Sequence, residues 1–126
     1  MWAFQDEATE NTNRFLDQVS ETGAVVPSIW TLEVANALLV GQRRGRLGAG
    51  EMAKFVALIE GMPIRQDSET GSRALHAIRE LAERHSLTAY DAAYLELAMR
   101  LGAPLASRDR SLCAAAERVG VEVLPL

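Results

Sequence analysis

Short apolar runs alternate with longer amphipathic stretches along the chain. The clearest short run is Ala24–Val26, which is partly β-branched and stops at Pro27, as a short buried strand does. Three further segments are expected to be strands: 63–66, 104–107 and 121–124. The stretches between them carry apolar residues at helical spacing. They predict helices over about 9–20, 29–44, 51–60, 68–85, 89–102 and 110–119.

Strands that alternate with helices indicate a parallel sheet covered by helices, an α/β layer fold. Because the predicted helices are long and the strands short, a helical bundle with extended connectors is the rival fold. No internal repeat, low-complexity stretch or linker divides the sequence. We therefore expect one domain over residues 1–126, and a chain of this length with 48% hydrophobic residues can bury one core.

Composition favours a cytoplasmic protein. No apolar run approaches the roughly 18 residues of a membrane helix, and the opening residues do not resemble a signal peptide. The single cysteine, Cys113, has no partner for an internal disulfide, which is typical of a reducing compartment. We expect no membrane association.

The formal charge of −4 argues against nucleic-acid binding through a global positive field. The basic residues are nevertheless nearly all arginine, and Arg43, Arg44 and Arg46 lie in one short stretch. Arginine suits bidentate contacts with phosphate. A solvated helix end, where the dipole favours cations, explains the same cluster equally well.

Three of the 17 acidic residues lie where strands give way to helices or where a helix begins. Glu33 follows the strand 24–26 and has Asn36 three residues on, on the same helix face. Asp91 falls in the first turn of a predicted helix, and Asp109 directly follows the strand 104–107. In an open parallel sheet, the carboxyl ends of strands and the starts of the following helices share one edge, where ligands bind.

Each of these acids also has a purely structural explanation. Thr88-x-x-Asp91 resembles a capping box, Asp109 can cap the short helix after it, and Glu33 can interact with a helix dipole. Several carboxylates on one edge repel one another unless a divalent cation neutralises them. Oxygen ligands without cysteine or histidine suit Mg²⁺ or Mn²⁺.

Three segments resemble PIN-domain ribonucleases, and most closely the VapC-type toxins of toxin–antitoxin pairs. They are Leu32–Leu38, Tyr90–Ala98 and Pro104–Leu112, and Asp91-Ala92-Ala93-Tyr94 is the most specific part. The resemblance covers nearly the whole chain. It implies a PIN-like three-layer α/β/α sandwich with a short-stranded parallel sheet.

The resemblance also implies a function. Family members bind Mg²⁺ or Mn²⁺ in an acidic pocket, cut RNA phosphodiester bonds with metal-activated water, form homodimers and are neutralised by a cognate antitoxin. The residues carried over as catalytic and metal-binding are Glu33, Asp91 and Asp109, whose carboxyl groups are expected to converge. The pocket neighbours are Asn36 and Ser107. The residues expected to contact RNA are Arg43, Arg44, Arg46, Arg108 and Arg110.

The chain departs from the family pattern at its start. Family members open with an apolar strand that ends in a metal-binding aspartate, whereas Met1–Glu7 matches the stretch that follows this strand. That strand is the middle one of the family's sheet, and the comparison implies that this chain lacks it. The chain is then either a truncated form or a degenerate member that acts through antitoxin binding. The gap must be filled by residues upstream of Met1, filled by a partner chain, or closed by direct pairing of 24–26 with 104–107.

Overall fold

A computed structural model of the protein describes residues 10–124. The helices in this part of the chain are α1 (Glu10–Thr22), α2 (Trp30–Arg43), α3 (Ala49–Gly61), α4 (Thr70–Arg73), the π-helical η2 (Ala74–Ile78), α5 (Arg79–His85), α6 (Ala89–Leu101) and α7 (Arg110–Arg118). The strands are β1 (Ala24–Val26), β2 (Ile64–Gln66), β3 (Leu105–Ala106) and β4 (Val123–Leu124). No helix among these residues is long and apolar enough to cross a membrane.

The strands form two separate parallel pairs. β1 pairs with β2, with Val25 opposite Arg65, and β3 pairs with β4, with Leu105 opposite Val123. The α/β fold with short parallel strands is therefore confirmed, and the rival helical bundle is wrong. Direct pairing of β1 with β3, one of the three outcomes expected for the gap, does not occur in the described part of the chain.

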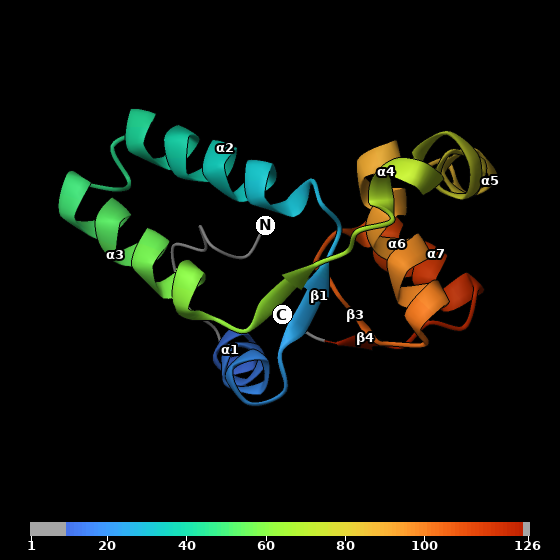
Figure 1. Cartoon of the computed structure of the whole chain (residues 1–126), viewed down its shortest axis with the longest axis horizontal. Coiled ribbons are helices and arrows are strands. Elements are labelled where there is room, and N and C mark those ends of the chain that lie inside the picture. The colour runs from blue at the N-terminus through green and yellow to red at the C-terminus, as the bar shows by residue number, and fades with distance from the viewer. Residues whose placement is uncertain (1–9, 125–126) are drawn as a thin grey trace.

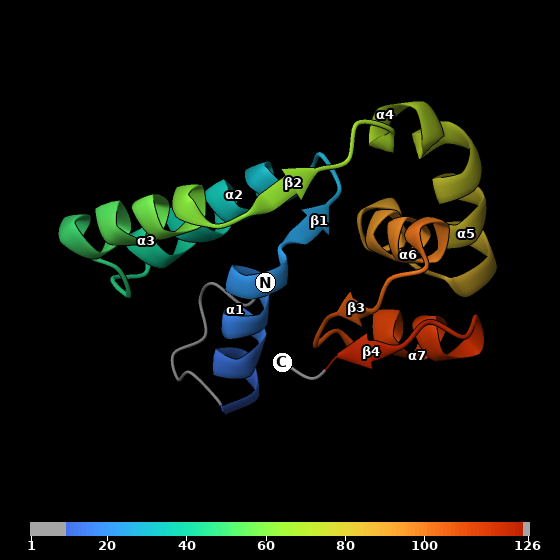
Figure 2. The same cartoon turned by 60° about the horizontal axis from the view of Figure 1, so that its bottom comes forward.

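Each strand pair belongs to its own half of the molecule (Figure 1). Helices α2 and α3 lie side by side and extend from the β1–β2 pair, whereas α4 to α7 gather beyond the opposite side of β1, near β3 and β4 (Figure 2). One hydrophobic cluster is built on β1 and α2, with Val26, Trp30 and Leu38 among its buried residues. A second cluster joins α5, α6, β3 and α7, and it includes Leu95 and Leu105.

Tyr94 connects the two halves, because its half-buried ring packs against both hydrophobic clusters. It lies on α6, whose residues Ala92, Ala93 and Leu95 are almost completely buried. Small side chains on this helix let a third cluster, around Ile78 of the π-helical segment, pack closely against it. Helix α6 is thus the central helix of the second half, and its position relative to β1 depends partly on Tyr94.

Several local predictions are confirmed. The hydroxyl of Thr88 accepts a hydrogen bond from the Asp91 N–H and caps α6, and the Asp109 carboxylate caps α7 in the same way. The residue before α2 is Ile29, which provides no side-chain cap, and the N–H of the preceding Ser28 donates to the hydroxyl of Thr70. The helix expected over 68–85 is real but begins at 70 and contains one π-helical turn.

Candidate active site

The three acids singled out in the sequence come from three different helix starts. Glu33 lies in the first turn of α2, just after β1. Asp91 lies in the first turn of α6. Asp109 is the residue before α7, and two residues separate it from the end of β3. The arrangement puts each carboxylate near helix N–H groups, which favour negative charge.

Asp91 is influenced by both of the other acids. Burial raises the pKa of the Asp91 carboxyl above its ordinary value, and the negative charges of Asp109 and then Glu33 raise it further. Like charges raise the pKa of a carboxyl group when they lie near it in the fold. Residues 58 and 18 positions away in the chain therefore both act on Asp91 at this edge of the fold.

Glu33 has a specific partner that sequence reasoning missed. The phenol of Tyr94 donates a short hydrogen bond to the Glu33 carboxylate, across the boundary between the two halves. Burial raises the pKa of Tyr94, and the hydrogen bond to Glu33 raises it further, so the phenol stays protonated as a donor. Tyr94 lies three residues after Asp91, on the same helix face, and this spacing is the only sequence signal for it.

A cavity of about 940 Å³ opens beside the acids. The residues that line this cavity include five of those predicted for the site, which are Glu33, Asp91, Ser107, Arg108 and Asp109. Other wall residues come from α1, from all four described strands, and from α2, α6 and α7, with Tyr94 of α6 among them. The structure therefore brings five of the ten predicted site residues together around one space.

The other predicted site residues lie elsewhere. Asn36 is exposed and does not line the cavity, because it is about 4.5 Å further along the α2 axis than Glu33. Arg43 ends α2, about 15 Å from Glu33 along the helix, and Arg44 and Arg46 follow it on the exposed surface. Arg110 is exposed at the start of α7 and is not part of the lining.

The donor chemistry of the site fits a hard divalent cation. All three acids offer carboxylate oxygens, the ligands that Mg²⁺ and Mn²⁺ prefer. Within residues 10–124, no three acidic, histidine or cysteine side chains are close enough together to hold one ion between them. Mg²⁺ commonly binds one or two carboxylates and fills its remaining positions with water and substrate phosphate. These three acids therefore fit a metal ion whose remaining coordination positions are filled by water and substrate phosphate.

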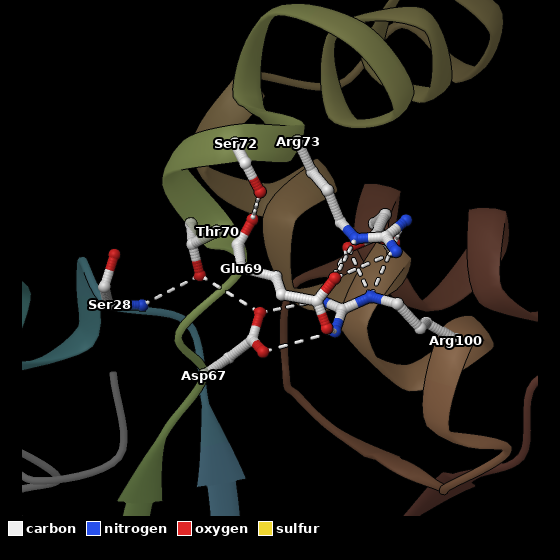
Figure 3. A network of polar contacts seen from close by, with 8 residues as sticks. Ser28, Asp67, Glu69, Thr70, Ser72, Arg73 and Arg100 are labelled. Carbon is white, nitrogen blue, oxygen red and sulfur yellow. Dashed lines mark hydrogen bonds and ion pairs between the residues drawn. The ribbon is translucent and has the colours of Figure 1, made fainter.

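A network of ion pairs lies on the other side of α6 (Figure 3). The guanidinium of Arg100 is 2.6 Å from Asp67, at the end of β2, and 3.0 Å from Glu96 on its own helix. Arg73 contacts both Glu96 and Glu69. Hydrogen bonding to Arg100 lowers the pKa of Asp67, and the same bond raises the pKa of Arg100. The network ties β2 to α4 and α6.

This fold and this set of acids define the class of protein. The family model described as PIN domain matches residues 1–118, so the chain belongs to the PIN-domain family, as the three sequence segments predicted.

Two proteins from Pyrobaculum aerophilum are among its relatives. The sequence is 30% identical to Ribonuclease VapC3 over 107 residues, which cover 85% of this chain and 80% of that protein. The fold is similar to the crystal structure of PAE2754, with a TM-score of 0.65, 20% sequence identity, and coverage of 94% of this chain and 87% of that chain.

Proposed function

We propose that the protein is an Mg²⁺- or Mn²⁺-dependent endoribonuclease that cuts RNA phosphodiester bonds at the edge formed by Glu33, Asp91 and Asp109. The observation that carries this proposal is that these three acids line one cavity, with the charges of Asp109 and Glu33 both raising the pKa of Asp91. Membership of the PIN-domain family and the 30% identity to a protein named Ribonuclease VapC3 give further support.

Asp91 and Asp109 are the residues we assign to hold the metal, with Glu33 as a third acidic ligand or a base beside it. When bound, the cation would lower the pKa of water and stabilise the charge that develops on the phosphate. The carboxylates alone would repel RNA, so the ion is also required for the substrate to approach. Tyr94 holds Glu33 in place, and the helix starts behind Asp91 and Asp109 limit the movement of those two acids.

RNA contacts are assigned to arginines near the cavity and on the surface. Arg108 lines the cavity directly before Asp109, which supports a contact between its guanidinium and a phosphate next to the cleaved bond. Arg43, Arg44 and Arg46 would contact RNA further along its backbone, since they lie at the far end of α2. Because the protein carries a net charge of −4, these local contacts have to supply the attraction.

The biological setting follows from the family. We propose that the protein is a cytoplasmic toxin of a toxin–antitoxin pair, that it forms a homodimer, and that a cognate antitoxin neutralises it. The relative's name, Ribonuclease VapC3, supports this assignment. Co-expression with the protein encoded beside it, followed by purification of a complex, tests the partner.

Cleavage of RNA by matched variants tests the activity. Asp91→Asn keeps the size and the hydrogen-bonding capacity of the side chain but removes its charge, and we expect a loss of at least about 100-fold in rate. Glu117→Gln changes an exposed acid on α7 by the same chemistry and should cleave like the wild type. Equal rates for all three proteins would show that the acidic edge is not the active site.

A second candidate function rests on the spacing of the acids. No three potential ligands in the described part of the chain are close enough to hold one ion, as expected for a family member that has lost activity and acts by binding an antitoxin. Such a protein would bind the antitoxin with the same affinity in Mg²⁺ and in a chelator, and would cleave RNA in neither.

A further inference from the structure

Two of the three acids that line the cavity are each preceded in the chain by an exposed apolar side chain. Leu32 comes directly before Glu33 and is 74% exposed, and Tyr90 comes directly before Asp91 and is 62% exposed. Neither residue belongs to any of the three hydrophobic clusters in the described part of the chain. A single exposed apolar residue is common on a protein surface, but these two lie next to the acids that we assign to the active site.

Helix geometry places both side chains where α2 meets α6. Tyr90 lies one turn before Tyr94 on the same face of α6, and the phenol of Tyr94 donates a hydrogen bond to Glu33 of α2. Leu32 lies one turn after Ile29, the residue before α2, and Ile29 packs against the hydrophobic cluster that α6 shares with the π-helical segment. Each half of the molecule therefore contributes one exposed apolar side chain beside the site.

The third acid is preceded by a charged side chain instead. Arg108 comes directly before Asp109, is exposed, and lines the cavity. Its guanidinium makes no ion pair or hydrogen bond with another residue of the described chain, whereas Arg100 is held by two buried carboxylates. An arginine without a carboxylate partner is available for a bidentate contact with phosphate. The residues before the three acids therefore offer two apolar surfaces and one cation.

We propose that Tyr90 and Leu32 bind one unpaired RNA base next to the bond that is cut, with the base stacked on the ring of Tyr90. This inference rests on the proposed function, and it narrows the substrate to RNA that is single-stranded at the cut. Proteins bind unpaired bases by stacking them on aromatic rings and by holding them between aromatic and apolar side chains. A base inside a duplex has both faces covered by its neighbours, so it does not reach this surface.

The charges beside the two apolar side chains favour a nucleotide over an apolar protein segment. A protein helix docked on Leu32 and Tyr90 would cover the neighbouring carboxylates of Glu33 and Asp91, and removing carboxylates from water without a counter-charge is costly. A nucleotide combines the two chemistries that the site offers, because the faces of its base are largely apolar and its phosphate is an anion. Its phosphate also suits the unpaired guanidinium of Arg108.

Titration of a fluorescein-labelled single-stranded RNA with matched variants tests the base site. All proteins carry Asp91→Asn, so that the RNA is not cut during the titration, and the protein with this change alone is the parent. We expect Tyr90→Ala to raise the Kd about 10-fold and Tyr90→Phe to keep it within about 2-fold, because phenylalanine retains the stacking ring. Leu32→Ala should raise the Kd about 3-fold. Leu75→Ala is its control and should bind like the parent, because Leu75 is 75% exposed but precedes none of the three acids.

Removing the base from the RNA shows whether the base and the ring touch. The probe is a series of the same RNA in which one nucleotide at a time lacks its base. At one position, the missing base should raise the Kd of the parent about 10-fold. This RNA should then bind Tyr90→Ala and the parent equally, since the interaction that the substitution removes is already absent. A variant that was merely misfolded would bind both forms of the RNA more weakly than the parent does.

Two results would overturn the proposal. The first is an equal Kd for Tyr90→Ala and the parent; if Leu32→Ala also lost self-association in sedimentation, the two side chains would belong to a contact between copies of the protein. The second is a further loss of about 10-fold when Tyr90→Ala binds each RNA of the series. Failure of the proposed function gives a different result, because the wild type would then cut no RNA while Tyr90→Ala still weakened RNA binding.

Discussion

Replacing Arg100 with methionine removes the cation that holds β2 against α6. The Arg100 side chain is only 16% exposed, and its partners Asp67 and Glu96 are each 10% exposed. The substitution leaves two carboxylates largely out of water and without their main counter-charge. Methionine fills a similar length of helix surface and has a similar helix propensity, so the change acts mainly on the charge.

The expected loss in the free energy of unfolding of Arg100→Met is large for a domain of this size. Removing one partner of a buried ion pair costs about 3–5 kcal/mol. Because Arg73 remains near Glu96 at 3.5 Å, we take the lower end, about 3 kcal/mol. That is a substantial part of the roughly 5–15 kcal/mol that stabilises a domain, and it corresponds to a fall in Tm of roughly 10 °C.

Urea unfolding of matched variants measures this loss. Arg79→Met is the control, because Arg79 also contacts two acids but is 55% exposed, with partners that are 62% and 79% exposed. It should cost less than about 1 kcal/mol. Adding Asp67→Asn and Glu96→Gln to Arg100→Met should restore much of the stability, since no carboxylate is then left unpaired.

The stability that the Arg100–Asp67 pair contributes depends on pH in a definite direction. Hydrogen bonding to Arg100 lowers the pKa of Asp67 below its ordinary value of 3.8 in the folded protein. A lowered folded pKa contributes stability above the unfolded value, and this contribution disappears as the pH falls through the folded pKa. The difference in the free energy of unfolding between wild type and Arg100→Met should therefore be largest at pH 7 and shrink below about pH 4. If the two proteins differ in this free energy by less than about 1 kcal/mol at pH 7, the Arg100 ion pairs do not stabilise the fold as buried pairs do.

Three further predictions concern the site. Tyr94→Phe removes the donor to Glu33 and should lower the free energy of unfolding by about 1–2 kcal/mol in urea titrations. Asp91→Asn removes charge repulsion and should leave that free energy equal or higher at pH 7, so a lower value would contradict the clustering of acids. Reversing the charges of Arg43 and Arg44 should weaken RNA binding and flatten its salt dependence; unchanged binding would show that this stretch is only a solvated helix end.

The sequence predicted the elements well where the local signal was strong. The strand Ala24–Val26 has the predicted bounds, because a β-branched run before Pro27 has few alternatives. The caps at Thr88 and Asp109 follow from short-range hydrogen bonding and were also predictable. Asp109 caps α7 and also lines the cavity, so a helix cap can at the same time be a candidate site residue.

Contacts between distant segments were not predictable in this way. The Tyr94–Glu33 hydrogen bond joins residues 61 positions apart, and the Arg100–Asp67 pair joins residues 33 apart. Only the Glu96–Arg100 part of the network has a sequence signal, the spacing of four residues on one helix face. Asn36 shares a helix face with Glu33 but does not line the cavity, because helical spacing gives a face and not how far along the helix a cavity extends.

We propose that the acidic edge of the protein cleaves RNA with the help of a divalent cation. The most direct measurement is the cleavage rate of the intact natural protein, stripped of metal by a chelator and then titrated with Mg²⁺ or Mn²⁺. We expect no cleavage in the chelator and full recovery as the metal is added, with no recovery for Asp91→Asn under the same conditions. Cleavage that continues unchanged in the chelator, or equal recovery by Asp91→Asn, would contradict metal-dependent cleavage at this edge.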